Sequence, residues 1–417
     1  MFDEVVWQFK RWVQRYRRLL SSLRMRGWAG TLERVRQPRP NEAPDTGPAV
    51  SIPVPAPGAR RILIVDAVFP DPERDSGSVR LCTMIRLVGE MGWHVHFHAD
   101  EGRATPTDLR QLSALGASVC EGGIVRWLRA NGGALDAVIL SRAPVADQYR
   151  GLVRKFAPRA LLIFDTVDLH FLRERRGADL LGDPALQRHA QATLRRELEL
   201  IAACDLSLVV SEEEKRMLAD LAPRHRVELL SNIHRVHVSA TPFEQRRDLL
   251  FIGGFSHPPN LDAMVWFTRE VLPLVHRSLP EITLHVVGDL TQAAIAQLSA
   301  PRVELHGRVA DLSALLDGCR LSVAPLRFGA GVKGKVNTAM SHGLPVVLTP
   351  IAAEGMHVSH ERDAMIAGDE REFADAIVRA YLDPALWHRL SDGGLQNVAT
   401  HFSEDVARQT LKNILPH

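Results

Sequence analysis

The stretch "FGAGVKGKVNTAMSHGLPVV", residues 328–347, satisfies two phosphate-binding patterns at once. Gly329, Gly331 and Gly334 spell G-x-G-x-x-G, and Gly329, Gly334 and Lys335 spell G-x-x-x-x-G-K. Both patterns use glycine to bring backbone N–H groups close to an anion at a helix N-terminus, where unpaired donors and the helix dipole favour negative charge. The stretch therefore indicates an anion-binding loop.

Neither pattern is complete. An ATP-binding loop needs Ser or Thr directly after its lysine to ligate magnesium, and Val336 stands there. A dinucleotide loop needs an acidic residue about 20 positions on, where the next strand ends in Thr349 and Pro350. What remains is a glycine-rich loop with Lys333 and Lys335 before a helix expected from about Val336. We interpret it as a diphosphate cradle that needs no metal; the alternative is a tight turn with both lysines in solvent.

The elements that must position this loop follow from the order of apolar segments. From residue 60 to Leu230 the strand candidates are "RILIV", "HVHFH", "AVIL", "ALLIF", "LSLVV" and "VELL". After a connection at 234–248 they are "LLFIG", "ITLHVVG", "RVELHG", "LSVAPL" and "LPVVL". Strands alternating with helical patterns predict an α/β protein with two doubly wound, mostly parallel sheets. Such sheets bind ligands outside the carboxyl ends of their strands.

The expected domain organisation has five parts. Residues 1–37 form a basic amphipathic helical segment, 38–59 a Pro-rich linker, 60–240 an N-terminal domain, 241–398 a C-terminal domain and 399–417 a C-terminal helix. Seven prolines between positions 38 and 57 favour an extended spacer. The last helix, capped by Ser403 in "FSEDVARQTLKNIL", is expected to pack back across the domains.

The N-terminal segment carries the basic excess. Residues 1–40 have a net charge of +7, which leaves −5 for the rest of a chain with a net charge of +2. Apolar residues recur there at helical spacing with arginines largely on other faces. We interpret residues 1–30 as an anchor on an anionic membrane surface. The alternative is a helix that docks on its own domain or on a partner protein.

Composition and sequence patterns indicate the cellular compartment and argue against several kinds of site. The four cysteines lie far apart without a C-x-x-C pair, so neither a cysteine zinc site nor a disulfide framework is indicated. No apolar run has the length of a membrane span, and the N-terminus lacks a signal-peptide pattern. We expect a cytoplasmic protein, peripheral at the inner face of the membrane. Nucleic-acid binding is not expected, because the basic excess is local and no aromatic platform accompanies it.

Several segments of the second domain resemble a known family. They are "FIGGFSHPPNLDAMVWF", "VELHGRVADLSALLDGCRLSVAPL", "GAGVKGKVNTAMSHGLPVV" and "IAAEGM". Together they look like the carboxyl-terminal domain of family 4 glycosyltransferases, and the resemblance covers 61–415. It implies the GT-B fold, in which two Rossmann-like domains face a cleft, with the nucleotide sugar held mainly by the second domain and the acceptor mainly by the first. It also implies transfer with retention of anomeric configuration, no metal and no cofactor beyond the sugar donor.

The resemblance also suggests roles for residues of the second domain. It places Gly253 and Gly254 beside the donor diphosphate, with Lys333 and Lys335 as its basic contacts and the three glycines of the loop as donor-binding positions. Many family members carry two glutamates eight positions apart, where this chain has Ala330 and Thr338. Both carboxylates are therefore missing. Asn337 and Thr338 are expected to offer neutral hydrogen bonds to ribose, and Glu354 is a candidate substitute.

In the first domain two segments are singled out. "FDTVDLHF", 164–171, resembles the segment that ends a strand at the cleft, which makes His170 the candidate contact of the transferred sugar, with Asp168 beside it. The alternatives are a histidine packed at a strand end and a helix-capping aspartate. Residues Asp75, Ser76 and Gly77 lie where related enzymes place small residues beside donor and acceptor; a simple turn with a helix cap is the alternative.

Three functions remain open from the sequence. The first is a retaining glycosyltransferase that builds an envelope polysaccharide, glycolipid or glycoprotein. The second is a non-catalytic GT-B subunit that binds a nucleotide or a partner transferase, which the missing glutamates favour. The third is a nucleotide-sugar epimerase of the same fold. Retention through the leaving phosphate requires no protein nucleophile, so the absence of an obvious Ser-His-Asp arrangement does not argue against an enzyme.

Overall fold

The computed structural model describes residues 58–73 and 75–416. The predicted amphipathic segment and nearly all of the Pro-rich linker lie outside the described residues. The chain divides into two compact units. Unit 1 contains the described residues up to Asp71, then Val79–Leu230 and the residues from Ala407, whereas unit 2 contains Pro72–Ser78 and Ser231–Val406.

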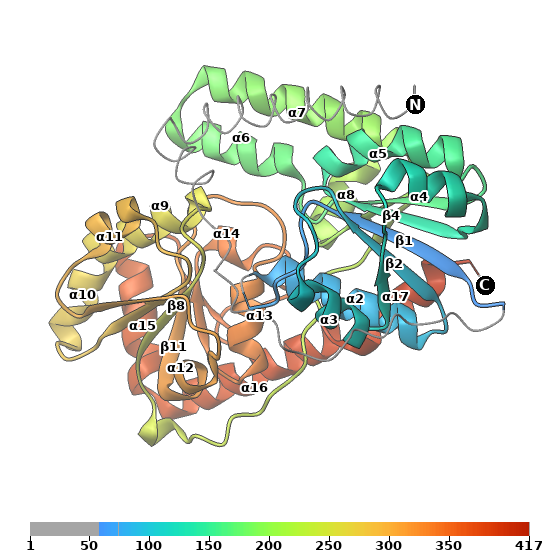
Figure 1. The fold of residues 1–417 in the computed structure, drawn as a ribbon. Coiled ribbons are helices and arrows are strands. Elements are labelled where there is room, and N and C mark those ends of the chain that lie inside the picture. The colour runs from blue at the N-terminus through green and yellow to red at the C-terminus, as the bar shows by residue number, and fades with distance from the viewer. Residues whose placement is uncertain (1–57, 74, 417) are drawn as a thin grey trace. The chain divides into compact units, whose positions relative to one another are not determined.

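Unit 1 is built on a seven-stranded sheet of parallel neighbours, ordered β3-β2-β1-β4-β5-β6-β7 (Figure 1). Its strands are β1 (Arg61–Asp66), β2 (His94–Ala99), β3 (Ala117–Val119), β4 (Ala137–Ser141), β5 (Leu161–Asp165), β6 (Leu206–Val209) and β7 (Val227–Leu229). The strand order turns at β1 and β4, so both of these strands send their carboxyl ends to the point where ligands bind in such sheets.

Helices cover both faces of this sheet. They are α2 (Ser76–Glu90), α3 (Pro106–Ala114), α4 (Ile124–Asn131), the 3₁₀ turn η1 (Gly132–Ala134), α5 (Ala143–Phe156), α6 (His170–Leu181), α7 (Pro184–Ala203), α8 (Glu212–Leu221) and the last helix, α17 (Glu404–Ile414). The chain returns from unit 2 to unit 1 through α17, where the Arg408 guanidinium lies 2.6 Å from the Glu90 carboxylate.

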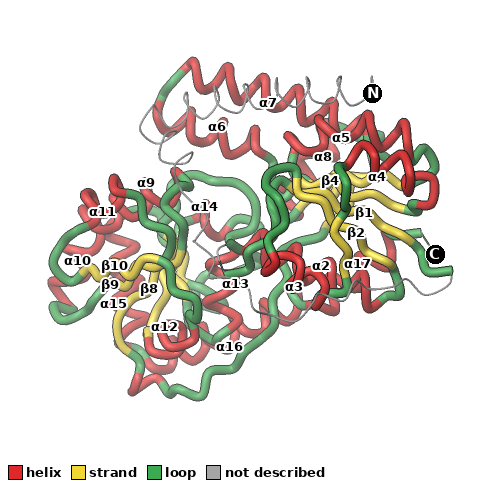
Figure 2. Tube along the Cα trace, viewed as in Figure 1, coloured by secondary structure: helices red, strands yellow, loops and turns green. Residues whose placement is uncertain are grey.

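Unit 2 has a six-stranded parallel sheet ordered β10-β9-β8-β11-β12-β13 (Figure 2). Its strands are β8 (Arg247–Ile252), β9 (Leu284–Val287), β10 (Val303–Gly307), β11 (Cys319–Ala324), β12 (Val346–Leu348) and β13 (Met365–Ile366). Its helical elements are η2 (Phe243–Gln245), α9 (Pro258–Trp266), the π-helical η3 (Phe267–Val271), α10 (Leu272–Ser278), α11 (Gln292–Leu298), α12 (Ser313–Gly318), α13 (Gly334–Ser341), α14 (Pro350–Ala353), α15 (Glu370–Leu382) and α16 (Pro384–His401).

Both faces of each sheet are buried, which explains why the strands read as continuous apolar runs. In β8, Leu249 and Phe251 pack into one core cluster and Leu250 packs into the cluster on the other side. In unit 1, the β1 residues Ile62 and Val65 have no exposed surface. The predicted pair of doubly wound α/β domains is confirmed.

Two short strands were not predicted. β3 and β13 contribute only three and two residues, "ASV" and "MI". Unlike the three-residue strands β7 and β12, which were predicted from "VELL" and "LPVVL", they do not stand out as apolar runs, and their strand state depends on pairing with β2 and β12. The helix of the glycine-rich loop also begins earlier than expected, at Gly334.

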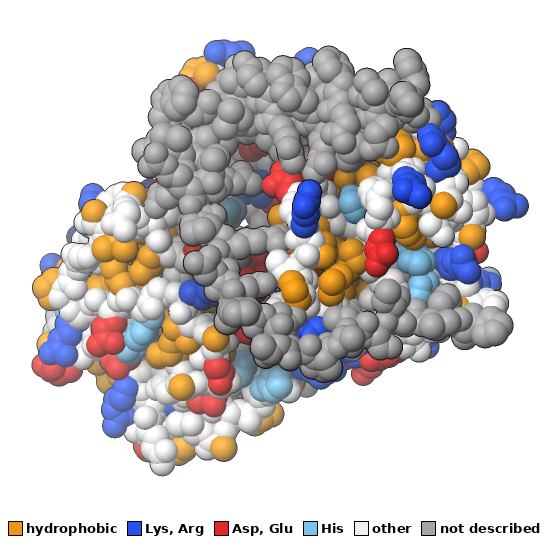
Figure 3. All heavy atoms as spheres, in the orientation of Figure 1, with side chains coloured by type: hydrophobic (Ala, Val, Ile, Leu, Met, Phe, Trp, Pro, Cys, Tyr) orange, Lys and Arg blue, Asp and Glu red, His pale blue; other side chains and the backbone are white. Residues whose placement is uncertain are grey.

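The described surface carries mixed charge. On the face shown in Figure 3, Lys and Arg side chains are scattered among acidic and apolar ones. None of the described helices combines the length and the apolarity needed to cross a bilayer.

The loop after β9 requires glycine at one position. Gly288 has a φ of +141°, and a Cβ there would lie 2.3 Å from the carbonyl oxygen of Gly253. We predict that Gly288→Ala lowers the free energy of unfolding by at least about 1–3 kcal/mol, because it adds a clash to a backbone conformation that alanine disfavours. Urea unfolding measures the change. Gly318→Ala is the control, since a Cβ at Gly318 meets no atom within 4 Å; an equal loss in both variants would contradict the prediction.

Candidate functional site

The amino end of α13 lies among close backbone contacts. Lys333 is the N-cap residue and Gly334 the first residue of the helix. A Cβ on Gly334 would lie 2.2 Å from the Cβ of Ser76, a residue grouped with unit 2. Glycine is therefore required here by close packing as well as by the pattern. The helix carries Lys335 in its first turn.

The Lys335 ammonium is enclosed by residues of strand β8, helix α9 and the loop that joins them. Its Nζ lies 2.5 Å from Asn260 Oδ1 of α9 and 4.3 Å from the ring centroid of Phe251 in β8. A Cβ on Gly253 would come within 2.9 Å of the same nitrogen. The missing side chain of Gly253 thus provides the space that the ammonium occupies.

This cation has no carboxylate partner among the described residues; its polar contact is the neutral amide of Asn260. Burial, with a smaller contribution from the charge of Lys333, lowers the pKa of Lys335 to about 7. A buried ammonium without a counter-charge reduces stability. The arrangement is suited to an anion that supplies the missing charge.

Backbone bonds fix the loop beside this cation. The Gly253 N–H donates to the Val287 carbonyl at 2.8 Å, and Asn260 Nδ2 donates to the Gly254 carbonyl at 2.8 Å. Asn260 therefore holds the glycine loop with its amide nitrogen and the Lys335 ammonium with its amide oxygen. Gly253 and Gly254 were predicted from the sequence; Asn260 and Phe251 were not, because nothing in "HPPN" or "LLFIG" marks them as partners of a lysine.

Lys333 has a different environment from Lys335. Its side chain is buried, and Nζ donates to the Gly331 carbonyl at 2.6 Å, within the glycine-rich loop. Its backbone N–H lies 3.3 Å from Met356 Sδ. Gly331 has a φ of +68°, so the loop uses glycine for its turn. The structure thus does not support the alternative in which both lysines are solvated.

Other predicted donor residues lie on or near α13. Asn337 is fully buried; its Oδ1 accepts from Asn232 Nδ2 at 3.4 Å, and its own Nδ2 has no partner in the described part of the chain. Thr338 is partly exposed, whereas Glu354 follows the short helix α14. These contacts place Asn337 in the interior beside Asn232.

In unit 1, charged residues gather at the carboxyl ends of three adjacent strands. Asp66, Ser141 and Asp165 end β1, β4 and β5, and Ser141 pairs with Asp165 in register. The Arg80 guanidinium donates to both Asp165 oxygens at 2.7 and 3.0 Å, and both groups are almost completely buried. Arg142 Nε donates to Asp66 at 2.9 Å. Each carboxylate is therefore neutralised by an arginine.

His170 and Asp168, both candidates from the sequence, lie together. His170 Nε2 is 3.2 Å from Asp168 Oδ1, and Arg173 pairs with the other oxygen of Asp168. Burial opposes the charge of Asp168, but Arg173 and His170 outweigh it and hold the pKa of this carboxyl far below its usual range. For His170, burial opposes protonation and Asp168 outweighs it, so its pKa is raised. The backbone N–H of His170 donates to Glu197 Oε1 at 3.0 Å.

The strand ends that carry these groups have unusual backbone angles. Arg142, directly after β4, has a φ of 74°, and Val167, between Asp165 and Asp168, has a φ of 64°. A β-branched residue in this region costs about 1–3 kcal/mol. Such local cost concentrates at functional positions, which supports a functional role for the segment 165–170.

The first βα loop is the third predicted position. The Asp75 carboxylate accepts from the Ser78 N–H at 2.8 Å and from the Ser78 hydroxyl at 3.0 Å. α2 begins at Ser76. Asp75 therefore acts as a cap for the first turn of α2, and Ser76 contacts Gly334 as described above.

A family model and one relative match part of this chain. Residues 246–383 match the family model "Glycosyl transferases group 1". An uncharacterized 44.6 kDa protein in the cps region of Klebsiella pneumoniae is 32% identical over 140 residues, which are 31% of this chain and 36% of that protein. The match thus spans about a third of that relative.

Solved structures show the fold of the whole described chain. A sucrose-phosphate synthase from Thermosynechococcus elongatus superposes with a TM-score of 0.65 at 15% identity, covering 85% of this chain and 98% of that one. HepE from Anabaena, in complex with UDP and glucose, superposes with a TM-score of 0.63 at 15% identity, covering 85% of this chain and 99% of that one. A mutant of S. aureus TarM, in complex with fondaparinux, alpha-GlcNAc-glycerol and UDP, superposes with a TM-score of 0.56 at 13% identity, covering 70% of this chain and 58% of that one. These are GT-B glycosyltransferase structures, so the predicted GT-B fold is confirmed.

The ion pair of His170 predicts its titration. We expect the NMR midpoint of His170 to lie above the ordinary value of 6.5 and to fall in Asp168→Asn, because the neutral amide no longer favours the imidazolium. Asp179→Asn, an exposed position of the same helix α6, is the control and should leave the midpoint unchanged. A midpoint at or below 6.5 in the wild-type protein would contradict the assigned pairing.

The buried cation predicts a pH-dependent stability difference. The folded pKa of Lys335, about 7, is below its unfolded value near 10.4, so the folded state binds fewer protons between these values and stability rises with pH there. Lys335→Met removes this dependence. Its melting temperature relative to wild type should therefore be higher at pH 6 than at pH 9, as measured by calorimetry. Lys412→Met, at an exposed lysine, should show no such pH dependence of the melting-temperature difference. The same pH dependence in both variants would refute the prediction.

Proposed function

We propose that this chain, which has the GT-B glycosyltransferase fold and a glycosyl transferases group 1 domain at 246–383, is a retaining family 4 glycosyltransferase. It transfers a hexosyl group from a nucleoside-diphosphate sugar to a hydroxyl of a polysaccharide, glycolipid or protein acceptor. The observation that carries the proposal is the Lys335 ammonium, which packs against the Gly253 loop and has the neutral amide of Asn260, not a carboxylate, as its polar contact among the described residues.

A sugar donor would supply the negative charge that is missing beside Lys335. Its diphosphate brings negative charge to a site that already contains an ammonium, a glycine loop and the amino end of a helix. When the nucleoside diphosphate leaves, more charge develops on the same phosphate oxygens. A positioned cation in a water-poor site stabilises that charge more than it stabilises the ground state. Lys335 therefore contributes to binding and to the transfer step, and Lys333, whose charge already acts on Lys335, adds to the same positive potential.

The other candidate residues receive proposed roles in binding the donor and the acceptor. No protein nucleophile is needed if the leaving phosphate accepts the acceptor's proton, and no metal is needed if lysines stabilise the phosphate charge. In unit 1, His170, whose pKa Asp168 raises against the effect of burial, is the proposed contact of the transferred sugar. Gly253, Gly254 and the glycines of the 329–334 loop allow the close approach of backbone donors to the diphosphate. We assign Thr338 and Glu354 to the ribose side of the donor, and Asp75, Ser76 and Gly77 to the acceptor side.

The similar proteins support the class of donor and product. The HepE structure contains UDP and glucose, and the TarM structure contains UDP with glycan compounds. The Klebsiella relative is described by its place in the cps region, which supports a role in polysaccharide biosynthesis. We further propose that residues 1–30 bring the enzyme to an anionic membrane surface at the cytoplasmic side, where lipid-linked acceptors are found.

A non-catalytic nucleotide-binding subunit is the second candidate. It is favoured by Ala330 and Thr338, which replace the two carboxylates expected of the family. The two functions share the diphosphate site and differ in turnover. Hydrolysis or epimerisation of the donor without an acceptor would instead indicate the epimerase alternative.

Nucleotide binding and transfer test the proposal together. In calorimetry with EDTA present, one of UDP, GDP, dTDP, CMP and ADP should bind the wild-type protein, and a nucleoside diphosphate should bind better than the monophosphate. Lys335→Met should weaken that binding about 30-fold or more, because removing one member of a buried charge pair costs about 2 kcal/mol or more. With the matching sugar donor and a lipid-linked acceptor, NMR should show a product with the donor's anomeric configuration.

Lys412→Met is the matched control and should bind like wild type. Binding without transfer for all acceptors would favour the non-catalytic subunit. Equal nucleotide affinity in wild type and Lys335→Met would remove the observation on which the proposal depends.

A further inference from the structure

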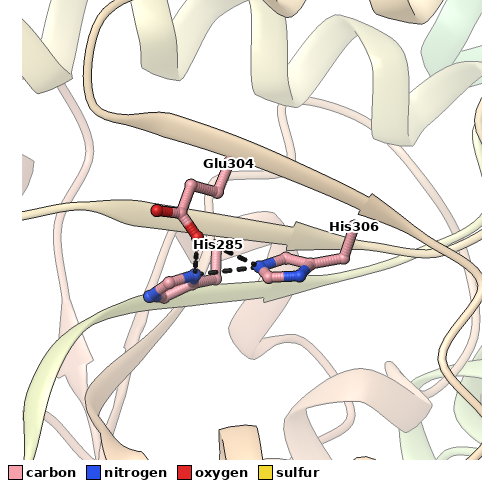
Figure 4. A group of neighbouring side chains, drawn as sticks. All are labelled: His285, Glu304 and His306. Carbon is pink, nitrogen blue, oxygen red and sulfur yellow. Dashed lines mark hydrogen bonds and ion pairs between the residues drawn. The ribbon is translucent and has the colours of Figure 1, made fainter.

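Three potential metal ligands converge on one face of the unit 2 sheet, on its edge strand β10 and the neighbouring strand β9. Figure 4 shows His285, Glu304 and His306 pointing toward one another. His285 Nδ1 lies 2.9 Å from His306 Nε2 and 3.3 Å from Glu304 Oε2. His306 Nε2 lies 3.7 Å from the same Glu304 oxygen. One atom from each residue thus forms a small triangle.

The size of this triangle matches a zinc coordination shell. Zinc binds imidazole nitrogen and carboxylate oxygen at about 2.0–2.1 Å in tetrahedral geometry, which separates neighbouring ligand atoms by about 3.3 Å. The three edges, 2.9, 3.3 and 3.7 Å, surround this value. A metal ion can therefore take the centre with small side-chain shifts. Two imidazoles and one carboxylate are also a donor set that suits zinc.

The other nitrogen of His285 has a partner of the kind that metal-bound histidines use. His285 Nε2 lies 3.6 Å from Asp248 Oδ2 on β8. Asp248 is itself fixed, because its Oδ1 accepts from the Thr283 N–H at 2.8 Å. A carboxylate on the outer nitrogen selects the tautomer that leaves Nδ1 free for a metal and increases its basicity.

The strands supply a rigid frame. Glu304 pairs with His285 in the parallel ladder of β9 and β10, and the register shifts between Leu305 and Gly307. His306 lies at this irregularity, which re-aims its side chain. Since Glu304 and His306 are exposed, an ion can reach the site from solvent.

We propose that His285 Nδ1, His306 Nε2 and Glu304 bind one Zn²⁺ ion, with Asp248 as the positioning residue of His285. Three protein ligands leave one tetrahedral position for water or another small ligand. The alternative is a histidine pair joined only by a hydrogen bond. The proposal is independent of the proposed transfer reaction and adds no metal to it.

The site would join β9 to β10 just before two loops of unit 2. His306 precedes Gly307, whose carbonyl accepts from the Gly288 N–H at 2.9 Å. Gly288 in turn packs on the Gly253 carbonyl, beside Lys335. A metal bound at the strand edge would therefore stabilise the loop that supports the diphosphate position.

Zinc binding to the untagged full-length protein tests the proposal. After treatment with a chelator and dialysis against Zn²⁺, elemental analysis should find one zinc per chain, and the melting temperature should rise with zinc concentration. Co²⁺ in its place should give the intense visible absorption of a four-coordinate ion. His306→Ala and Glu304→Gln should each lose the zinc, and Asp248→Asn should weaken binding about 10-fold to 100-fold.

His401→Ala is the matched control, because His401 belongs to another histidine pair, stacked on His357 with ring centroids 4.2 Å apart. It should retain wild-type zinc binding. Glu304→Gln keeps the shape of the side chain, so it remains informative if His306→Ala does not fold. Absence of zinc from the wild-type protein at micromolar concentrations, or equal binding by wild type and Glu304→Gln, would overturn the proposal.

Discussion

The constraint on which the second unit depends is the Lys335 ammonium, which is buried beside Gly253 without a carboxylate partner in the described part of the chain. Its position requires a glycine at 253, an amide at Asn260 to hold both the loop and the lysine, and a glycine at 288 to let the next loop approach. These features reduce stability locally. A bound anion would offset this cost, as expected of a preorganised site.

The acidic side chains at the strand ends of unit 1 have basic partners, unlike Lys335 in unit 2. Asp66 and Asp165 are paired with arginines, and Asp168 pairs with Arg173 and lies beside His170. The unusual backbone angles of this region lie at Arg142 and Val167. The strand ends of unit 1 thus carry paired charges, whereas the polar contact of Lys335 in unit 2 is a neutral amide.

The sequence predicted the fold and named several residues of the candidate site. Long apolar runs predicted the two doubly wound sheets, the glycine pattern singled out Lys333 and Lys335, and the family resemblance named Gly253 and Gly254. The helix start at Gly334, the contact of Asn260 with Lys335 and the cluster of His285, Glu304 and His306 were missed. Each depends on strands or loops that are distant in sequence, and a single sequence does not reveal such contacts. The missing C-x-x-C pair argued only against a cysteine zinc site and had no bearing on histidines that face one another across two strands.

Proton uptake on nucleotide binding shows whether Lys335 meets the diphosphate. At pH 8 the free protein should hold Lys335 largely neutral, since its pKa is about 7, and a bound diphosphate should protonate it. Calorimetry in two buffers with different ionisation enthalpies should therefore show that wild type takes up close to one more proton per nucleotide than Lys335→Met does. Equal uptake by the two proteins would show that Lys335 does not meet the diphosphate, and the account of the second unit would be wrong.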